Sequence, residues 1–463
     1  MKLNYFNFKK FRDKFLLTND FGEYAFVSPA DFRELIERKT ISSTETYRVL
    51  KDKNFIFEEN ELEFTSFNRL RLRNTKSYVS TATSLHIFVV TTACNMKCVY
   101  CQANNGSDSR PMMMSAETAE KSVDIALQSP EKNLNFEFQG GEPLLNYPVI
   151  RHIVEYAETR KGDHVISYNI VTNLSLLDDE KKNFFRKYHF GISTSVDGDC
   201  NVHNHNRTFQ NGDGTFEAVA GKIRELKKDG FHVGAIETTT RYSLQYPGEI
   251  VRTYFELGFD SIFIRPLTPL GRAAKCWDSI GYTPEEFVAF YRRCLDEIIN
   301  LNMNGHSFRE EHAAIFLRKI DGQFMNYMEL RSPCGAGIGQ MAYYSDGSIF
   351  TCDEGRMLYE MGNDMFRLGH VGESCYQDLI HNRICRSVSA SSILESIPSC
   401  CDCVYQPYCG TCPVVNYALD ADIIAKQPRN YRCRIYSGML DEIFRRIYDN
   451  EENTMNIFKN WSK

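Results

Sequence analysis

Six apolar or β-branched runs recur along the middle of the chain, separated by stretches with helical periodicity. The runs, between residues 84 and 266, are SLHIFVVTT, NFEFQGG, HVISYNIVTN, GISTSVDG, HVGAIETTT and SIFIRP. The intervening segments include SAETAEKSVDIALQS, DDEKKNFFRKY, GTFEAVAGKIRELKKDG and GEIVRTYFELG. Short apolar runs are typical of buried strands, whereas apolar residues three and four positions apart are typical of helices. The alternation predicts six βα units in a parallel α/β sheet or barrel.

The first 80 residues have a different pattern. KFLLTNDFGEYAFVS predicts two strands around a turn at Asn19-Asp20, and Ser28-Pro29 predicts the start of a helix over ADFRELIE. A second helix is predicted over STETYRVLKDK. These elements suggest a winged-helix-like α+β module over residues 1–80. From these residues alone, a module that binds a partner and a module that only covers the main domain stay equally open.

The alternation ends after TPEEFVAFYRRCLDEIINL, which predicts a strong amphipathic helix. Beyond it, cysteine and glycine become frequent, and AYYSDGSIFTC predicts a hairpin that turns at Asp346-Gly347. We therefore place a domain boundary near residue 310. The prediction is an α/β domain over 81–310 and a cysteine-rich domain over 311–463.

Composition and charge exclude several classes of function. The chain has 463 residues, 43% of them hydrophobic, and a net charge of −6 without a basic run. Neither a nucleic-acid surface nor a membrane-surface patch is therefore indicated. The first residues lack the apolar core of a secretion signal, and no segment reaches the length of a membrane-spanning helix. We expect a cytoplasmic protein.

The 16 cysteines are unevenly distributed. In a reducing compartment cysteines are metal ligands or free thiols rather than disulfides. Six of them lie within residues 400–433 and three lie in CNMKCVYC, which follows directly on the first predicted strand. The clustering favours metal binding, and the three-cysteine loop is expected at the carboxyl ends of the parallel strands, where barrel enzymes place their chemistry.

Cys94, Cys98 and Cys101 suit an iron-sulfur cluster better than zinc. Three thiolates on a four-iron cluster leave one iron without a protein ligand, so that position is free to react. A structural zinc site would need a fourth cysteine or histidine nearby, and none occurs within ten residues of the loop. Zinc and unligated thiols remain the alternatives.

The CxxxCxxC spacing, with Tyr100 before the last cysteine, resembles the cluster motif of the radical S-adenosylmethionine (SAM) superfamily. Gly140-Gly141-Glu142-Pro143, at the end of the second predicted strand, resembles the GGEP element of that family. The resemblance implies a partial (β/α)6 TIM-type barrel with one 4Fe-4S cluster. It also implies reductive cleavage of SAM to methionine and a 5'-deoxyadenosyl radical, which abstracts hydrogen from the substrate.

The same resemblance implies contacts to SAM. Glycines allow close approach of backbone groups, and Glu142 offers a charged partner to the methionine amino group. Asn173 and Ser195 would line the pocket, with Ser195 near the ribose. Arg207, in HNHNR, suits a bidentate contact to the SAM carboxylate, with a surface loop cation as the alternative. His203 and His205 in the same loop are expected to be surface residues.

The C-terminal cysteines resemble those of SPASM domains, which extend many radical SAM peptide maturases. Cys334 and Cys352 are separated by twelve residues, Gly347 and four further residues. In the second half of the pattern, two, five and two residues lie between Cys400, Cys403, Cys409 and Cys412. The family usually has three residues in the last gap. The resemblance implies two auxiliary clusters, with a zinc-ribbon-like fold as the alternative. The first would be bound by Cys400, Cys403, Cys409 and Cys433, and the second by Cys334, Cys352 and Cys412.

The second auxiliary cluster has no obvious fourth ligand, and water, a side chain or the substrate could take that position. Asp353, directly after Cys352, resembles the position of a proposed proton acceptor in formylglycine-forming anaerobic sulfatase maturases. For Asp353 we favour the alternative, which is a hydrogen-bonding role near the cluster.

Nearly the whole chain, including LLTNDFGEYAFVSP, LHIFVVTTACNMKCVYCQ, SPCGAGIG and DEGRMLYEMGN, resembles the B-type members of the paired radical SAM maturases of the His-Xaa-Ser repeat peptide system. The resemblance implies action on a ribosomally made precursor peptide, beside a second radical SAM maturase and a small electron donor such as flavodoxin or ferredoxin. It favours leader-peptide binding by residues 1–80, where a leader adds as a strand.

Two other functions stay in competition with this one. The first is formylglycine-type oxidation of Ser or Cys in a protein substrate. The second is a multi-cluster electron carrier without SAM chemistry. GGEP and STSVDG argue against the carrier, because electron transfer needs no pocket for methionine or ribose.

Overall fold

The computed structural model describes residues 1–58, 62–103, 111–323, 325–424 and 428–463. Its centre is a ten-stranded sheet in the order β12-β11-β10-β9-β8-β7-β6-β13-β14-β15. Strands β6 to β12 pair in parallel, each with its neighbour in the chain. They are β6 (Leu85–Thr91), β7 (Asn133–Gly140), β8 (Val165–Val171), β9 (Gly191–Ser195), β10 (Val233–Thr238), β11 (Ser261–Arg265) and β12 (Arg309–Glu310). The six predicted strands are confirmed.

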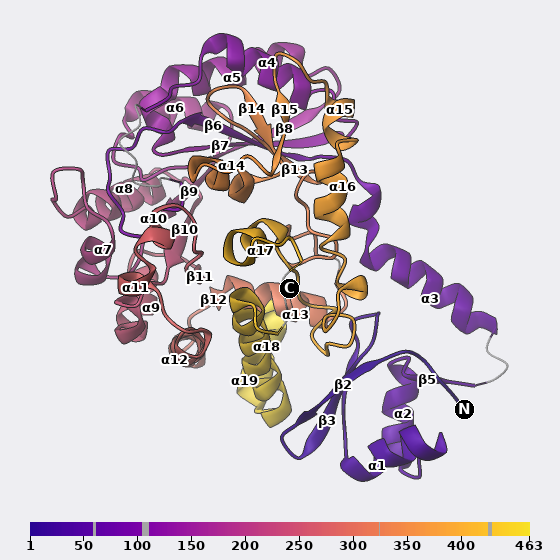
Figure 1. Cartoon of the computed structure of the whole chain (residues 1–463). Coiled ribbons are helices and arrows are strands. Elements are labelled where there is room, and N and C mark those ends of the chain that lie inside the picture. The colour runs from indigo at the N-terminus through magenta and orange to yellow at the C-terminus, as the bar shows by residue number, and fades with distance from the viewer. Residues whose placement is uncertain (59–61, 104–110, 324, 425–427) are drawn as a thin grey trace.

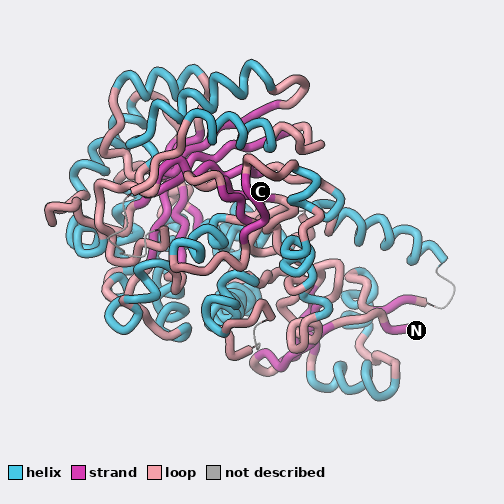
Figure 2. Tube along the Cα trace, turned by 45° about the horizontal axis from the view of Figure 1, so that its top comes forward, coloured by secondary structure: helices cyan, strands magenta, loops and turns pink. Residues whose placement is uncertain are grey.

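Helices cover the outside of the curved sheet, which forms a partial barrel (Figures 1 and 2). Phe136 and Phe138 of β7 are buried, whereas Glu137 and Gln139 alternate with them and are partly exposed. Alternation of this kind follows from the two-residue period of a strand. The covering helices are α4 (Ala116–Ala126), α5 (Tyr147–Arg160), α6 (Asp179–Lys187), α7 (Cys200–Asn206), α8 (Phe216–Lys228), α9 (Pro247–Glu256) and α12 (Pro284–Met303).

The N-terminal part is a small module beside the barrel (Figure 1). An antiparallel sheet has the order β2-β3-β4, and a strand pair joins β1 to β5. The predicted strand pair and both predicted helices are confirmed, whereas β1, β2 and β5 were not foreseen. The elements are β1 (Lys2–Leu3), β2 (Asn7–Phe11), β3 (Lys14–Thr18), β4 (Tyr24–Val27), α1 (Pro29–Arg33), the π-helix η1 (Glu34–Arg38), α2 (Thr44–Asp52) and β5 (Ile56–Phe57). Helix α3 (Leu62–Thr75) leads from it to the barrel.

The cysteine-rich part continues the barrel sheet. Its first strand pairs in parallel with β6, and the predicted hairpin follows, with Gly347 at a φ of 93° in the turn. Only glycine adopts such a φ without strain. The strands are β13 (Gln340–Tyr343), β14 (Ser348–Phe350) and β15 (Arg367–His370). The helices are α13 (Glu311–Ile320), α14 (Asp353–Glu360), α15 (Tyr376–Ile380), α16 (Arg383–Ala390), α17 (Pro413–Asp420), α18 (Tyr431–Asp449) and α19 (Glu452–Trp461).

The boundary predicted near residue 310 falls between β12 and α13. Because β13 to β15 extend the same sheet as the barrel strands, the two parts share a sheet across this boundary. The domain limits of 1–80, 81–310 and 311–463 stay predictions. Within the described ranges, no helix has the length and apolar character needed to cross a bilayer.

Candidate functional site

The loop with Cys94, Cys98 and Cys101 follows β6, at the carboxyl edge of the parallel strands. The three thiols interact electrostatically with one another. Burial raises the pKa of Cys94 to about 12 and that of Cys98 to about 11. The guanidinium groups of Arg207 and Arg272 oppose this rise at Cys98. Cations beside buried thiols suit an anionic iron-sulfur cluster, whose ligands are thiolates.

Gly140 and Gly141 bring the end of β7 against the start of the cysteine loop. A Cβ atom on Gly140 would lie 2.4 Å from the Thr91 carbonyl oxygen, and one on Gly141 would lie 2.3 Å from the Ala93 carbonyl oxygen. Backbone atoms cannot yield to such contacts. These glycines were expected to admit a ligand, but their first effect is to admit the backbone of the loop that carries Cys94.

Glu142 is fully buried and joins the ends of two strands. Its carboxylate accepts hydrogen bonds from the Thr172 hydroxyl (2.6 Å) and from the backbone N–H groups of Asn173 (2.7 Å) and Leu144 (3.0 Å). Burial raises its pKa to about 7, although these hydrogen bonds work in the opposite direction. The carboxylate therefore shapes the edge at which the resemblance places the amino group of SAM.

Asn173 and Ser195 lie at the ends of β8 and β9. The Asn173 amide donates to the Asn95 side chain (2.9 Å), beside Cys94, and its carbonyl oxygen accepts from Ser175. Ser195 is partly exposed and pairs across the sheet with Ile236. Both residues thus stand at the same edge as the cysteine loop.

Arg207 is not a surface cation, because its side chain is only 11% exposed. Its Nε pairs with the Asp197 carboxylate at 3.0 Å, and its guanidinium stands 5.2 Å from the centre of the Tyr100 ring. The Tyr100 hydroxyl donates to both Asp197 oxygens, at 2.8 and 2.7 Å. Asp197, fully buried in STSVDG, was missed by the sequence analysis. It holds the aromatic residue of the cysteine loop.

His203 corrects an expectation of the sequence analysis. It is fully buried in α7, where its Nδ1 accepts from the Asp197 backbone N–H (3.3 Å) and its Nε2 contacts the Thr215 hydroxyl (3.1 Å). Burial lowers its pKa to about 4. His205 is exposed, as expected, and stacks on Tyr242.

A change of pH from 7 to 5 is expected to lower the free energy of unfolding through His203. The unfolded histidine takes up a proton near pH 6.5, whereas the folded one does so only near pH 4. The unfolded state therefore binds more protons in this window, and the stability that is present above pH 6.5 is lost on acidification. In urea unfolding, the free energy of unfolding should fall between pH 7 and pH 5 by about 2 kcal/mol more in the parent protein than in His203→Gln. An equal fall in both proteins would contradict this role of His203.

Gly271 starts helix α10 (Gly271–Lys275) at a φ of +57°, directly against the cysteine loop. A Cβ atom there would lie 2.4 Å from the Gln102 carbonyl oxygen and 2.7 Å from that of Cys101. The next residue, Arg272, donates its backbone N–H to the Cys101 carbonyl at 2.9 Å. The chain after β11 thus fixes the backbone of the last cysteine.

Gly271→Ala is expected to reduce the iron held by the three-cysteine loop by more than half, because the new methyl group must displace Cys101. The iron and sulfide content of the anaerobically purified protein measures this. Gly221→Ala is the matched control, since Gly221 is exposed in α8 and its Cβ would meet no atom within 4 Å. Unchanged iron content in Gly271→Ala would mean that the loop tolerates the displacement.

Four of the C-terminal cysteines surround one cavity. The cavity has a volume of about 300 Å³, and the thiol of Cys433 interacts electrostatically with the other three. Burial raises the pKa of Cys400 to about 12 and that of Cys409 to about 11. The structure thereby brings together the set that the resemblance implied, which is Cys400, Cys403, Cys409 and Cys433.

A second set of thiols, from Cys334, Cys352 and Cys412, lies in one small apolar cluster with Leu270 and Phe366. All three are buried and interact electrostatically with one another. Burial raises the pKa of Cys412 to about 12. Cys412 lies in this cluster although two residues, and not the three that are usual in SPASM domains, separate it from Cys409. Neither these thiols nor any other three or more His, Cys, Asp or Glu side chains in the described ranges close around the position of a single metal ion.

Asp353 begins α14 and forms an ion pair with Arg356, at 2.7 Å from its Nε. Arg356 is buried and faces Cys101 of the first cysteine loop. Asp353 also interacts electrostatically with Glu137 of β7. The aspartate thus stands directly after Cys352 and is held by its ion pair with Arg356.

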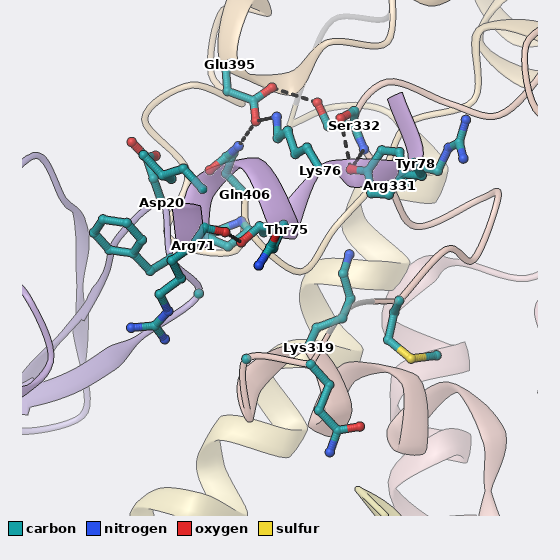
Figure 3. Close-up of a pocket in the computed structure, with 18 of the residues that line it drawn as sticks. Asp20, Arg71, Thr75, Lys76, Tyr78, Lys319, Arg331, Ser332, Glu395 and Gln406 are labelled. Carbon is teal, nitrogen blue, oxygen red and sulfur yellow. Dashed lines mark hydrogen bonds and ion pairs between the residues drawn. The ribbon is translucent and has the colours of Figure 1, made fainter. Parts of the chain in front are cut away.

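A cavity of about 590 Å³ lies between the N-terminal module and the cysteine-rich part (Figure 3). The turn Asp20–Gly22, helix α3 and the end of α13 line it, and Cys409 contributes to its wall. At one side of the cavity, the Glu395 carboxylate forms an ion pair with Lys76 and accepts hydrogen bonds from the Ser332 hydroxyl and the Gln406 amide (Figure 3). Lys319 donates to the carbonyl oxygens of Leu330 and Tyr408, and burial lowers its pKa to about 8.

Residues 88–254 match the radical SAM superfamily, and this range contains the three-cysteine loop, Gly140 to Glu142 and the Arg207 site. The chain is a radical SAM enzyme. Its cofactors are SAM and a 4Fe-4S cluster. The assignment removes the electron carrier without SAM chemistry from the candidate functions.

This radical SAM enzyme is 25% identical over 382 residues to the cysteine-type anaerobic sulfatase-maturating enzyme of Clostridium perfringens, a match that covers 80% of this chain and 98% of the relative. A solved structure of native anSMEcpe with bound AdoMet and the Kp18Cys peptide has a TM-score of 0.67 at 21% identity, covering 82% of this chain and 99% of that one. Streptococcus suis SuiB bound to its precursor peptide SuiA has a TM-score of 0.56 at 14% identity, covering 92% and 98%. Both structures share the fold of this enzyme.

Proposed function

We propose that this enzyme is a maturase that cleaves SAM reductively to a 5'-deoxyadenosyl radical and uses it to modify a ribosomally synthesised precursor peptide. The observation that carries the proposal is the meeting of two further thiol sets beside a radical SAM site, in a chain that also has a separate N-terminal module. Two proteins of the same fold have been solved with peptides bound.

Cys94, Cys98 and Cys101 would hold the catalytic cluster, which when bound supplies the electron that cleaves SAM. Glu142, whose carboxylate is buried at the strand edge, would pair with the amino group of SAM. The glycines before it, Asn173, Ser195 and the buried Tyr100 would complete the pocket. The proposed role of Arg207 changes with the structure: its Nε is committed to Asp197, so only the other guanidinium nitrogens remain to bind a carboxylate.

The two C-terminal thiol sets would hold two auxiliary 4Fe-4S clusters. Their separation in the fold supports this assignment, because Cys400, Cys403, Cys409 and Cys433 surround a cavity and the other three share an apolar cluster. Asp353 would accept the proton released from the substrate. Its electrostatic interaction with Glu137 of barrel strand β7 supports that role.

The N-terminal module would recognise the leader of the precursor peptide. Its winged-helix-like sheet has two edge strands, β2 and β4, and an extended peptide can add to such an edge. The module is tied to the auxiliary cysteines, since the Asn7 amide donates to the Cys403 carbonyl oxygen and the Thr18 hydroxyl to that of Val404. The cavity beside the Asp20–Gly22 turn, which polar and apolar side chains line together, offers a place for peptide that leaves the sheet (Figure 3).

The finer proposal is a substrate with His-Xaa-Ser repeats, handled together with a second radical SAM maturase and a small electron donor such as flavodoxin or ferredoxin. It rests on the sequence resemblance over nearly the whole chain. A second candidate is formylglycine formation on Ser or Cys of a protein substrate. The 25% identity to a cysteine-type anaerobic sulfatase-maturating enzyme favours it.

Mass spectrometry of a His-Xaa-Ser precursor peptide, co-expressed with this enzyme with and without the second maturase, tests the proposal. We expect a mass change that requires this enzyme and the leader segment of the peptide. A sulfatase-derived peptide that gains an aldehyde, detected by hydrazine labelling, would favour formylglycine formation instead. If neither peptide changes while SAM is still cleaved, the proposed substrate class is wrong.

A further inference from the structure

The two edges of the β2-β3-β4 sheet in the N-terminal module differ in what they leave open. In an antiparallel sheet the N–H and C=O groups of a residue point to the same side of the strand, and this side alternates from one residue to the next. The Asn19 N–H donates to the Glu23 carbonyl oxygen at 3.2 Å, in the register that pairs β3 with β4. Counting from this pair determines which backbone groups of β2 and β4 point away from β3.

On β2 the backbone groups that point away from the sheet are those of Phe8 and Lys10. The alternation directs Leu16 of β3 toward β2, where it pairs with Lys9, so the residues on either side of Lys9 point outward. Strand β2 is the last of its sheet, and the side chains of Phe8 and Lys10 are exposed. Within the described ranges, these outward N–H and C=O groups have no hydrogen-bond partner. Such an edge is a template for an added strand.

The edge of β4 is partly closed by Lys53. The same alternation makes the groups of Tyr24 and Phe26 point outward on β4. The outward carbonyl oxygen of Tyr24 accepts a hydrogen bond from the Lys53 Nζ at 2.9 Å, and this ammonium lies 4.1 Å from the centre of the Tyr24 ring. The Lys53 carbonyl oxygen in turn accepts from the Asn19 amide at 2.9 Å. A strand that adds to β4 must displace Lys53, whereas one that adds to β2 displaces no such contact.

The side chains at the β2 edge indicate which strand would fit. The Phe8 ring packs on Phe32 of α1, with 4.8 Å between ring centres, and on Phe15 at 6.3 Å, yet Phe8 remains 49% exposed. An apolar side chain of an added strand would cover it. Lys10 lies on the same face, is exposed and has no ion pair among the described residues. Two copies of β2 would bring lysines together across the strands, which is destabilising, whereas an acidic residue would pair with Lys10.

We propose that the leader of the precursor peptide adds as a strand to β2 and not to β4, with an apolar side chain over Phe8 and an acidic side chain, two positions away, beside Lys10. The inference rests on the proposed function, because it requires a peptide substrate, and it selects one of the two edges. Phe8 and Lys9 also line the cavity of about 300 Å³ that the four auxiliary cysteines surround. A leader on β2 would therefore lie beside these cysteines, where the module meets the cysteine-rich part (Figure 1).

Amide hydrogen exchange, followed by mass spectrometry in the full chain, locates the added strand. The probe is the leader segment of a His-Xaa-Ser precursor peptide. We expect the leader to slow exchange within residues 7–11, because the N–H groups of Phe8 and Lys10 gain acceptors, and to leave residues 24–27 unchanged. Protection of residues 24–27 without protection of 7–11 would place the leader on β4 and overturn the proposal.

Three variants at Lys10 test the edge by fluorescence anisotropy of the labelled leader. Lys10→Pro removes an outward N–H that β3 does not use, a position where a strand tolerates proline, and should bind about fivefold more weakly than Lys10→Ala, the effect of one lost hydrogen bond. Lys10→Glu should weaken binding about threefold relative to the parent. Exchange of one acidic leader residue for lysine should restore that loss. Lys39→Glu, at an exposed lysine of the same module, is the matched control and should bind like the parent.

Equal affinity of the parent, Lys10→Pro and Lys10→Glu would overturn the role of the β2 edge alone, while the proposed function stands. If the parent itself binds no leader, recognition of the leader by the module is wrong, and the inference fails with it. Lys10→Glu leaves the backbone unchanged, so this variant and the exchange experiment decide the matter even if urea unfolding shows that Lys10→Pro does not fold.

Discussion

Replacement of Cys98 by alanine is expected to abolish the formation of 5'-deoxyadenosine from SAM. Cys98 stands in the middle of the three-cysteine loop, where its thiol faces Cys101 and the cation of Arg207. Two remaining thiols leave a second iron without a ligand, and the cluster is then lost. The measurement is chromatography of the products after anaerobic incubation with SAM and dithionite, in reconstituted protein.

Cys200→Ala is the control for the Cys98 variant. Cys200 is an exposed thiol at the start of α7, so its loss should leave both iron content and product formation unchanged. Product at the parental rate from Cys98→Ala would show that the catalytic cluster is held elsewhere in the chain.

Asp197→Asn is expected to lower the free energy of unfolding by about 3–5 kcal/mol, the range found when one partner of a buried ion pair is removed. Asp197 is fully buried between the Arg207 guanidinium and the Tyr100 hydroxyl. An amide can still accept from Tyr100, but it leaves the charge of Arg207 buried without a counter-ion. Urea unfolding of the cluster-free protein gives the difference directly.

Asp213→Asn provides the comparison for this variant, because Asp213 is an exposed carboxylate close by in the chain. It should change stability by less than about 0.5 kcal/mol, as is usual at the surface. If Asp197→Asn proved as stable as Asp213→Asn, Arg207 would have to be neutralised by another group. Replacement of Arg207 by methionine in the Asp197→Asn background should recover part of the loss.

Periodicity was sufficient to predict the strands and most of the helices of the barrel. Each apolar run between residues 84 and 266 is a strand. Strand β6 is buried almost throughout and leaves a continuous apolar run, whereas β7, β9 and β11 alternate buried and partly exposed residues with the two-residue period of a strand. The hairpin at Asp346-Gly347 was equally readable, since a turn with a positive φ needs glycine. Strand β2 was not foreseen: its sequence, NFKKF, carries two lysines and lacks a strong apolar run.

The candidate site was only partly readable from the sequence. Spacing pointed to Cys94, Cys98 and Cys101, which one short loop carries, whereas the two C-terminal thiol sets came only from the resemblance to SPASM domains, because their members lie far apart in the chain. Asp197 and Gly271 were missed, since their importance depends on what lies against them, which is Arg207 for the first and the Cys101 carbonyl for the second. His203 was misread for the same reason, because a polar helix gives no sign of which single side chain is covered.

The pairing of β13 with β6 has a consequence for how this protein is made. Strand β6 is the first of the barrel to be synthesised, yet its second neighbour comes from the cysteine-rich part, at Gln340–Tyr343. A nascent chain that has completed the barrel strands still presents an open, apolar strand edge, which is prone to pair with other chains. Expression of the barrel alone should yield aggregates, and chaperone demand should fall only once the C-terminal hairpin has emerged from the ribosome.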